Sequence, residues 1–159
     1  MNMTVYMTAN PGNRESLGPL CEAVRQAAPE VQILAWAGPL VGCGPAFSFC
    51  TAACRSADLV VCCGHRGQAI GIQAGMAHGA GTPVLGIPEG GVPSPMMDGC
   101  VSRWVKDRAA VPALIARLQR CLSRIESRCP EAEACPRCDL KSLCRYFSFM
   151  AGEEKEGAT

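Results

Sequence analysis

The run Asp58–Cys63, which reads DLVVCC, constrains the fold more than any other part of the sequence. A strand with one face in water alternates apolar and polar residues, whereas a strand buried on both faces is apolar throughout. Strands of the second kind lie at the centre of parallel sheets. A glycine-containing loop, Gly64–Gly67, and a small-residue segment with helical character, Gln68–Gly79, follow this run. We therefore expect a strand–loop–helix unit here.

The same alternation of strand-like and helix-like segments extends from residue 4 to about residue 128. We expect strands at Thr4–Ala9, Val31–Trp36, Asp58–Cys63, Thr82–Ile87 and Val101–Lys106. We expect helices at Ser16–Ala28, Phe47–Arg55, Gln68–Gly79 and Val111–Ser127. Strands joined by helices through short loops form parallel sheets with right-handed crossovers. Residues 1–128 are thus predicted to form a flavodoxin-like or Rossmann-like three-layer α/β domain with a five-stranded parallel sheet.

Three loops of this domain are the predicted place for a ligand, because such sheets bind ligands beyond the carboxyl ends of their strands. They are Asn10–Glu15, Gly64–Gln68 and Pro88–Pro95. Arg66, together with nearby backbone N–H groups, is suited to hold a phosphate or carboxylate. Glu89 is the carboxylate that could act as an acid or base there.

Four cysteines lie within the C-terminal stretch CPEAEACPRCDLKSLC, with the spacing C-x5-C-x2-C-x5-C. A Cys-x2-Cys pair can direct two thiolates at one metal centre, and two outlying cysteines complete a four-sulfur set. Residues 129–150 are therefore predicted to form a small metal-binding appendix, which a metal would have to organise. Residues 151–159 read as a solvated, disordered tail. The predicted ligands are Cys129, Cys135, Cys138 and Cys144.

Both zinc and an iron–sulfur cluster accept four thiolates. Zinc modules usually carry two close pairs of ligands, whereas this stretch has one pair. The spacing of Cys135, Cys138 and Cys144 resembles the short C-terminal cluster motif of iron–sulfur RecB-type nucleases. That resemblance implies a 4Fe–4S cluster, with zinc as the alternative. Leu140 and Leu143 flank the ligands and would either shield a cluster from water or pack a zinc knuckle onto the domain.

The composition also indicates the cellular compartment of the protein and the classes of partner it is expected to bind. Twelve cysteines without a signal-peptide pattern at the N-terminus indicate a cytoplasmic protein with reduced thiols. Most of the eight cysteines outside the tail should then be small core residues. Adjacent cysteines of a strand point to opposite faces, so Cys62 and Cys63 cannot serve one site. The formal net charge of +1 and the lack of a long apolar run argue against nucleic acid and membrane as partners.

The stretch ADLVVCCGHRGQAIGIQAGMAHGAGTPV, residues 57–84, resembles the nucleoside 2-deoxyribosyltransferase-like superfamily. The matching pieces are Ala57-Asp58, Gly67, the helix segment Gln73–Ala77 and Gly81–Val84. The opening VYMTANP and the tripeptide Ser94-Pro95-Met96 resemble further family motifs. The resemblance covers most of residues 4–128. It implies a nucleoside- or nucleotide-shaped pocket with ligand-binding residues at Asn10, Arg66, Gly67, Gln73 and Ser94.

Gln73 stands where the family carries its nucleophilic glutamate. A neutral amide is a very poor nucleophile and cannot stabilise an oxocarbenium ion, so binding is expected rather than glycosyl transfer. The leading hypothesis is a cluster-containing protein with a nucleotide-type cleft, acting in ligand binding, redox sensing or electron transfer. Two alternatives stay open. One is a deoxyribosyltransferase or N-glycosidase with a structural metal site, and the other is a scaffold subunit docking onto a redox partner protein.

Two further expectations concern a second cofactor and self-association. The loop TANPGNRE loosely resembles the flavodoxin phosphate loop, which makes FMN a minor alternative as a cofactor. The helix segment Ala69–Ala80 is rich in small residues and could pack closely against a second copy, so a homodimer is plausible.

Overall fold

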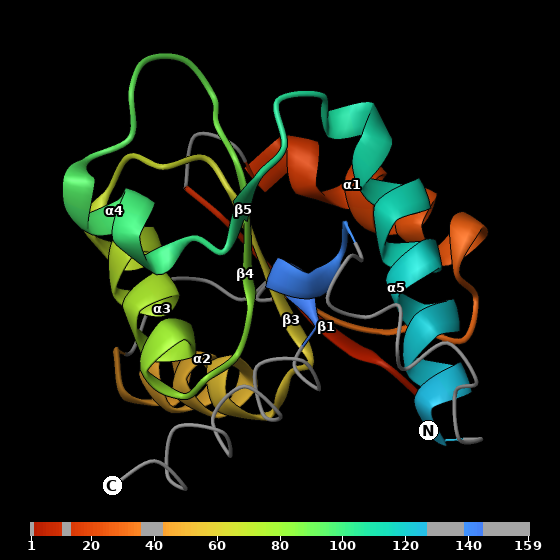
Figure 1. The fold of residues 1–159 in the computed structure, drawn as a ribbon. Helices are drawn as coiled ribbons and strands as arrows, with labels where there is room; N and C mark the ends of the chain where they lie inside the picture. The colour runs from red at the N-terminus through yellow and green to blue at the C-terminus, as the bar shows by residue number, and fades with distance from the viewer. Residues whose placement is uncertain (1, 11–13, 36–42, 127–138, 145–159) are drawn as a thin grey trace, which may run out of the picture.

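The computed structural model describes residues 2–10, 14–35, 43–126 and 139–144 (Figure 1). Its sheet has five parallel strands in the order β2-β1-β3-β4-β5. The strands are β1 Thr4–Ala9, β2 Gln32–Ala35, β3 Leu59–Cys63, β4 Val84–Ile87 and β5 Arg103–Trp104. The α-helices are α1 Arg14–Ala27, α2 Cys43–Ser56, α3 Gln68–Gly79, α4 Pro95–Cys100 and α5 Val111–Glu126. Two short 3₁₀ turns are η2 Arg108–Ala110 and η4 Lys141–Leu143.

Helices cover both faces of the sheet, as Figure 1 shows. α1 and α5 lie together on one face, and α2, α3 and α4 cover the other. Each face has its own buried apolar cluster between sheet and helices. The predicted three-layer α/β architecture with a five-stranded parallel sheet is therefore confirmed.

β3 is the central strand that the sequence predicts, since all five of its residues are buried. Leu59, Val61 and Cys63 enter the cluster under α1 and α5, whereas Val60 and Cys62 enter the cluster under α2 and α3. This alternation follows from the two-residue repeat of a strand. It places the two adjacent thiols on opposite faces of the sheet, as expected.

The carboxyl ends of three neighbouring strands lie at one level. Ala9 of β1 is in register with Cys63 of β3, and Cys63 is in register with Ile87 of β4. The loops that start at Asn10, Gly64 and Pro88 therefore leave the same edge of the sheet. The chain order reverses between β1 and β3, which is the position where open α/β sheets bind ligands.

Residues 139–144 pack onto the α/β domain beside β5 and α5 (Figure 1). Arg103 of β5 donates to the Asp139 carbonyl oxygen at 2.9 Å, and the Arg117 guanidinium of α5 holds the Asp139 carboxylate through both oxygens. Leu140 and Leu143 are buried in the same apolar cluster as α1 and α5. The described part of the predicted metal-binding appendix is thus packed into the main core.

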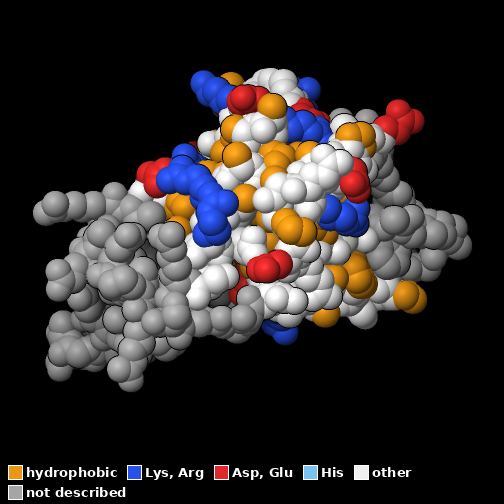
Figure 2. Space-filling view, turned by 90° about the vertical axis from the view of Figure 1, so that its right-hand side faces the viewer, with side chains coloured by type: hydrophobic (Ala, Val, Ile, Leu, Met, Phe, Trp, Pro, Cys, Tyr) orange, Lys and Arg blue, Asp and Glu red, His pale blue; other side chains and the backbone are white. Residues whose placement is uncertain are grey.

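Figure 2 looks onto the side of the molecule where α1 and α5 lie. On the described part of this face, basic and acidic side chains both occur among hydrophobic ones and do not gather into one charged patch. Among the described helices, none combines the length and the apolar character that crossing a membrane would require.

Candidate functional site

A cleft of about 900 Å³ opens beyond the carboxyl ends of β3 and β4, between α3 and α4. Its walls come from the β3–α3 loop, α3, the β4–α4 loop and α4. The lining residues are His65, Arg66, Gly67, Gln68, Gly71, Ile72, Gly75, Val92, Ser94, Met96, Met97 and Cys100. Two of the three loops predicted to bind a ligand thus meet at one cavity.

Three of the predicted ligand-binding residues, Arg66, Gly67 and Ser94, line this cleft. Asn10 lies next to them rather than in the wall: a Cβ atom on Gly67 would come within 3.1 Å of Asn10 Oδ1. Gly67 has φ +110°, a backbone conformation that residues other than glycine rarely adopt. The amide of Asn10 and the bend at Gly67 therefore fix the position of the β3–α3 loop.

Arg66 reaches from the β3–α3 loop across to the β4–α4 loop. Its guanidinium lies against Gly91, where a Cβ atom would meet Arg66 Nη2. Within the described residues Arg66 forms no ion pair, and it is exposed to solvent at the cleft. No carboxylate of the described residues therefore neutralises its positive charge, which lies at the mouth of the cavity.

The first turn of α3 also lines the cleft. Gly67 is the N-cap residue of this helix, and no side chain of the described residues accepts from its first N–H groups. Such N–H groups have no partner inside the helix, and the helix dipole gives this end a partial positive charge. Gln68 and Gly71, which belong to this turn, both line the cavity.

His65 is a polar residue that the structure buries in the wall of the cleft. The side chain is only 7% exposed, and neither Nδ1 nor Nε2 has a hydrogen-bond partner in the described part of the chain. The ring packs edge-on against the indole of Trp104, with centroids 6.3 Å apart. A buried polar atom without a partner is uncommon in native proteins and calls for an explanation.

Large apolar side chains also line the cleft. Ile72, Val92 and Met96 are 54%, 89% and 81% exposed, high values for such large hydrophobic side chains. Ser94 Oγ accepts from the Met97 backbone N–H at 3.2 Å and caps α4. A cavity that combines a few polar groups with apolar side chains is typical of small-molecule sites.

Gln73 does not line the cleft and is held instead by Tyr6 of β1. The Tyr6 hydroxyl donates to Gln73 Oε1 at 3.0 Å and lies 3.2 Å from the sulfur of Cys50. Burial, followed by the neighbouring Cys50, raises the pKa of Tyr6 above its ordinary value. The phenol therefore stays neutral and acts as a hydrogen-bond donor to the amide.

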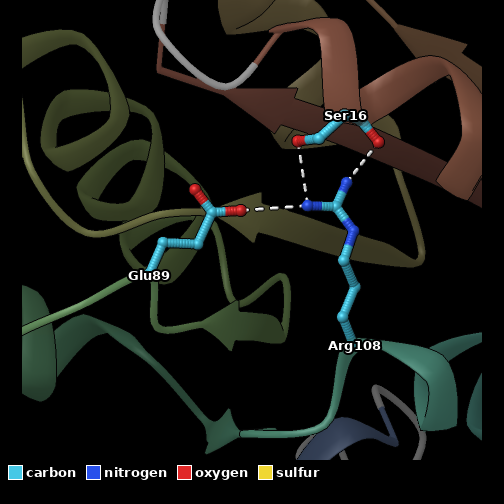
Figure 3. A network of polar contacts seen from close by, with 3 residues as sticks. All are labelled: Ser16, Glu89 and Arg108. Carbon is cyan, nitrogen blue, oxygen red and sulfur yellow. Dashed lines mark hydrogen bonds and ion pairs between the residues drawn. The ribbon is translucent and has the colours of Figure 1, made fainter.

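Glu89 is the counter-ion of Arg108, as Figure 3 shows. Arg108 Nη1 lies 2.9 Å from Glu89 Oε1 and donates to Ser16 Oγ at 2.9 Å, while Nη2 donates to the Ser16 carbonyl oxygen. This network ties the β4–α4 loop to α1 and η2. Glu89 is not a lining residue of the cleft, so its predicted role as an acid or base there has no support in the geometry.

The core cysteines have the properties of structural thiols. Burial raises the pKa of Cys63 to about 12 although Arg108 opposes it, and burial together with Cys50 raises the pKa of Cys54 to about 12. Burial raises the pKa of Cys21 and Cys62 as well. A protonated thiol is a poor nucleophile and metal ligand. The expectation that such cysteines act as small core residues holds for these four.

Cys144 is the one predicted metal ligand within the described residues; Cys129, Cys135 and Cys138 lie outside them, as does the predicted tail 151–159. In residues 2–10, 14–35, 43–126 and 139–144, no three His, Cys, Asp or Glu side chains form a group that could hold a metal. Cys144 is half-buried and packs against the core under α1 and α5. Of the four predicted ligands the structure thus places only Cys144, and the four-cysteine centre stays a prediction.

Sequence reasoning missed part of this site. Two of the predicted ligand loops contain His65 and Val92, but no binding role was assigned to either, and Ile72 and Met97 of the helices were not placed at the site. The position of His65 directly after the central strand was the available signal, but its burial depends on Trp104 from a distant strand.

Comparison with known proteins supports the fold. A conserved protein from Enterococcus faecalis, known from its crystal structure, is similar with a TM-score of 0.56 and 14% sequence identity. The similarity covers 71% of this chain and 96% of that protein. No protein-family profile and no curated protein sequence matches the chain. The chain therefore shares the three-layer α/β fold of that structure.

Proposed function

We propose that this protein binds a nucleoside- or nucleotide-type ligand between α3 and α4 and carries a metal centre on its C-terminal cysteines, acting in ligand binding, redox sensing or electron transfer. The observation that carries the proposal is the cleft at the carboxyl edge of β3 and β4. It is lined by the positively charged Arg66, by the start of α3 and by the exposed apolar side chains of Ile72, Val92 and Met96.

This mixed lining suits a ligand that carries both charged and apolar groups. A sugar or phosphate is recognised by charged groups and backbone N–H groups, and a base is recognised by apolar contact. The cavity of about 900 Å³ lies within the range of pockets that enclose such molecules.

Binding is favoured over glycosyl transfer because no carboxylate that could act as the glycosyl nucleophile lines the cleft. Gln73 is neutral and engaged with Tyr6, and Glu89 is engaged with Arg108. Among the residues that line the cavity, none is an aspartate or glutamate. Release of free base from nucleosides or nucleoside monophosphates by the purified protein would contradict this part of the proposal.

The metal centre would be held by Cys129, Cys135, Cys138 and Cys144, with a 4Fe–4S cluster as the proposed group. A bound cluster supplies one-electron redox chemistry. The contribution of the chain is to anchor residues 139–144 through the Asp139 contacts and to pack Cys144 against the apolar cluster that contains Leu140 and Leu143. Low local polarity of this kind is one of the factors that set a cluster potential.

The binding part of the proposal predicts a loss of affinity when Arg66 is replaced by glutamine. A charge-assisted hydrogen bond contributes about 1.5–3 kcal/mol, so nucleotide affinity should fall by roughly 10- to 100-fold. Isothermal titration with a panel of nucleosides and nucleotides measures this. Arg120→Gln is the matched control, because Arg120 is exposed on α5 across the sheet and should leave binding unchanged. Equal affinities in all three proteins would contradict the assignment of the cleft.

The metal part predicts iron and acid-labile sulfide in anaerobically purified protein, with about four of each per chain for a cubane cluster. The visible absorption band should vanish in Cys135→Ser and Cys138→Ser. It should persist in Cys50→Ser, a control in α2 where the serine hydroxyl can keep the contact with Tyr6. A colourless protein with one zinc per chain would show that the four cysteines hold a structural zinc ion and not a cluster. A protein without metal would overturn the proposal of a metal centre.

A further inference from the structure

We propose that the β4–α4 loop is a short lid that closes on the base of a bound nucleotide, with Val92 as its apolar cover. The lid is the segment Gly90–Pro93, which lies between Glu89 and Ser94. The loop rises from the carboxyl edge of the sheet before it enters α4 (Figure 1). This inference rests on the proposed function of the cleft and adds a closing step to ligand binding.

Both ends of the lid are fixed to the body of the domain. On one side, Glu89 forms an ion pair with Arg108 at 2.9 Å, and Arg108 also donates to Ser16 of α1. On the other side, the Ser94 hydroxyl accepts from the Met97 backbone N–H at 3.2 Å and caps α4. A movement of the loop is therefore confined to the four residues between these two anchors.

The lid itself has few contacts with the rest of the domain. Within the described part of the chain, Gly90, Gly91 and Val92 take part in no hydrogen bond. A Cβ atom on Gly90 would have no neighbour within 4 Å, and the three atoms nearest to one on Gly91 all belong to the Arg66 side chain. Segments with exposed backbone and few packing contacts are those that open and close most readily.

The pair Gly90-Gly91 provides the hinge. The two residues have φ +68° and +73°. Glycine adopts positive and negative φ about equally well, so rotation at these positions costs little. Loop closures in proteins are absorbed by a few such residues. The pair lies directly after the Glu89 anchor, where a change in φ and ψ would swing the rest of the lid.

Val92 gives the lid a reason to close. Its side chain is 89% exposed although it lines the cavity, and Ile72 of α3 lines the same cavity at 54% exposure. Leaving such side chains in water is unfavourable, and burying them against an apolar surface stabilises the closed arrangement. The flat faces of a nucleotide base offer that surface, whereas a sugar phosphate does not. The expected trigger of closure is therefore the base.

The binding test uses the full-length protein, with adenosine 5′-monophosphate and ribose 5-phosphate as probes in isothermal titration. Val92→Ala should weaken binding of adenosine 5′-monophosphate by roughly 10-fold, because it removes about two buried carbon groups from the closed complex. Binding of ribose 5-phosphate, which lacks the base, should stay unchanged. Phe47→Ala is the matched control, since Phe47 is a 58% exposed hydrophobic residue of α2 that does not line the cleft.

Hydrogen exchange tests the closure itself. In the free protein the amides of Gly90, Gly91 and Val92 should exchange rapidly, because no acceptor in the described residues holds them. Saturating adenosine 5′-monophosphate should slow their exchange by about 10-fold, the ratio by which the Val92 contact favours the closed loop. In Val92→Ala, also at saturation, most of this slowing should be lost.

The outcomes separate the lid from the proposed function. Tight binding of adenosine 5′-monophosphate that neither depends on Val92 nor slows exchange in the loop would overturn the lid and leave the nucleotide cleft. A loss of affinity in Val92→Ala without slower exchange in the wild type would make Val92 a fixed wall residue and would also overturn the lid. An equal loss for ribose 5-phosphate would overturn closure on the base. No binding of either probe would overturn both proposals.

Discussion

Replacing Leu143 with alanine is expected to lower the free energy of unfolding by about 2–4 kcal/mol, as for other large-to-small changes in a closed core. Leu143 is 1% exposed and packs, together with Leu140, into the cluster beneath α1 and α5. The loss combines the transfer of the removed methyl groups with the cavity they leave. Urea denaturation followed by circular dichroism measures it.

Lys141→Ala is the matched control for Leu143→Ala, because Lys141 lies in the same turn η4 and is exposed. It should change the free energy of unfolding by less than about 0.5 kcal/mol. If Leu143→Ala were as mild as this control, residues 139–144 would not be part of the folding core. The metal content of both variants, measured in parallel, shows whether the docked turn is also needed to form the cysteine centre.

Replacing Gly86 with valine is expected to destabilise the protein by about 3 kcal/mol, near the upper end of the usual costs of over-packing. A Cβ atom on Gly86 would lie 2.5 Å from Cε3 and Cζ3 of Trp104 and 3.0 Å from Cγ1 of Val101. The indole therefore has to move. Because Trp104 holds the ring of His65, ligand affinity in the cleft should fall as well.

Thermal unfolding and ligand titration of Gly86→Val test this prediction. Gly99→Ala provides the comparison, since nothing lies within 4 Å of the added Cβ atom and the position is helical. It should be neutral or stabilising by about 0.5–1 kcal/mol, because alanine restricts the unfolded chain. Wild-type stability in Gly86→Val would mean that the indole has space to move aside freely.

The periodicity of the sequence predicted most of the fold. The bounds of β1 and α3 agree with the expected Thr4–Ala9 and Gln68–Gly79, because turn-forming residues bracket both elements. α4 was missed, although Ser94-Pro95 is a typical helix start, with a capping hydroxyl and proline at the first helical position. The surrounding glycines and prolines obscured that signal. The fifth strand was predicted too long: Val101 ends α4, and only Arg103–Trp104 pairs with β4.

The candidate site was predictable only where it depends on position along the chain. Arg66, Gly67 and Ser94 follow predicted strands, and the rule for parallel sheets brings them together. The orientation of Gln73 depends on Tyr6, and the engagement of Glu89 depends on Arg108, which is 19 residues away in the sequence. Such partners are set by tertiary packing. The sequence left open whether Leu140 and Leu143 shield a metal centre or pack onto the domain, and the structure places both in the main core.

The docking of residues 139–144 also has a consequence for biosynthesis. Domains commonly begin to fold while the ribosome is still extending the chain. Here the apolar surface that the sheet and α5 present to Leu140 and Leu143 is formed by residues that precede them in the chain. That surface stays uncovered until both leucines have left the ribosome. A released chain truncated after residue 138 should therefore keep an exposed hydrophobic face, which chaperones recognise.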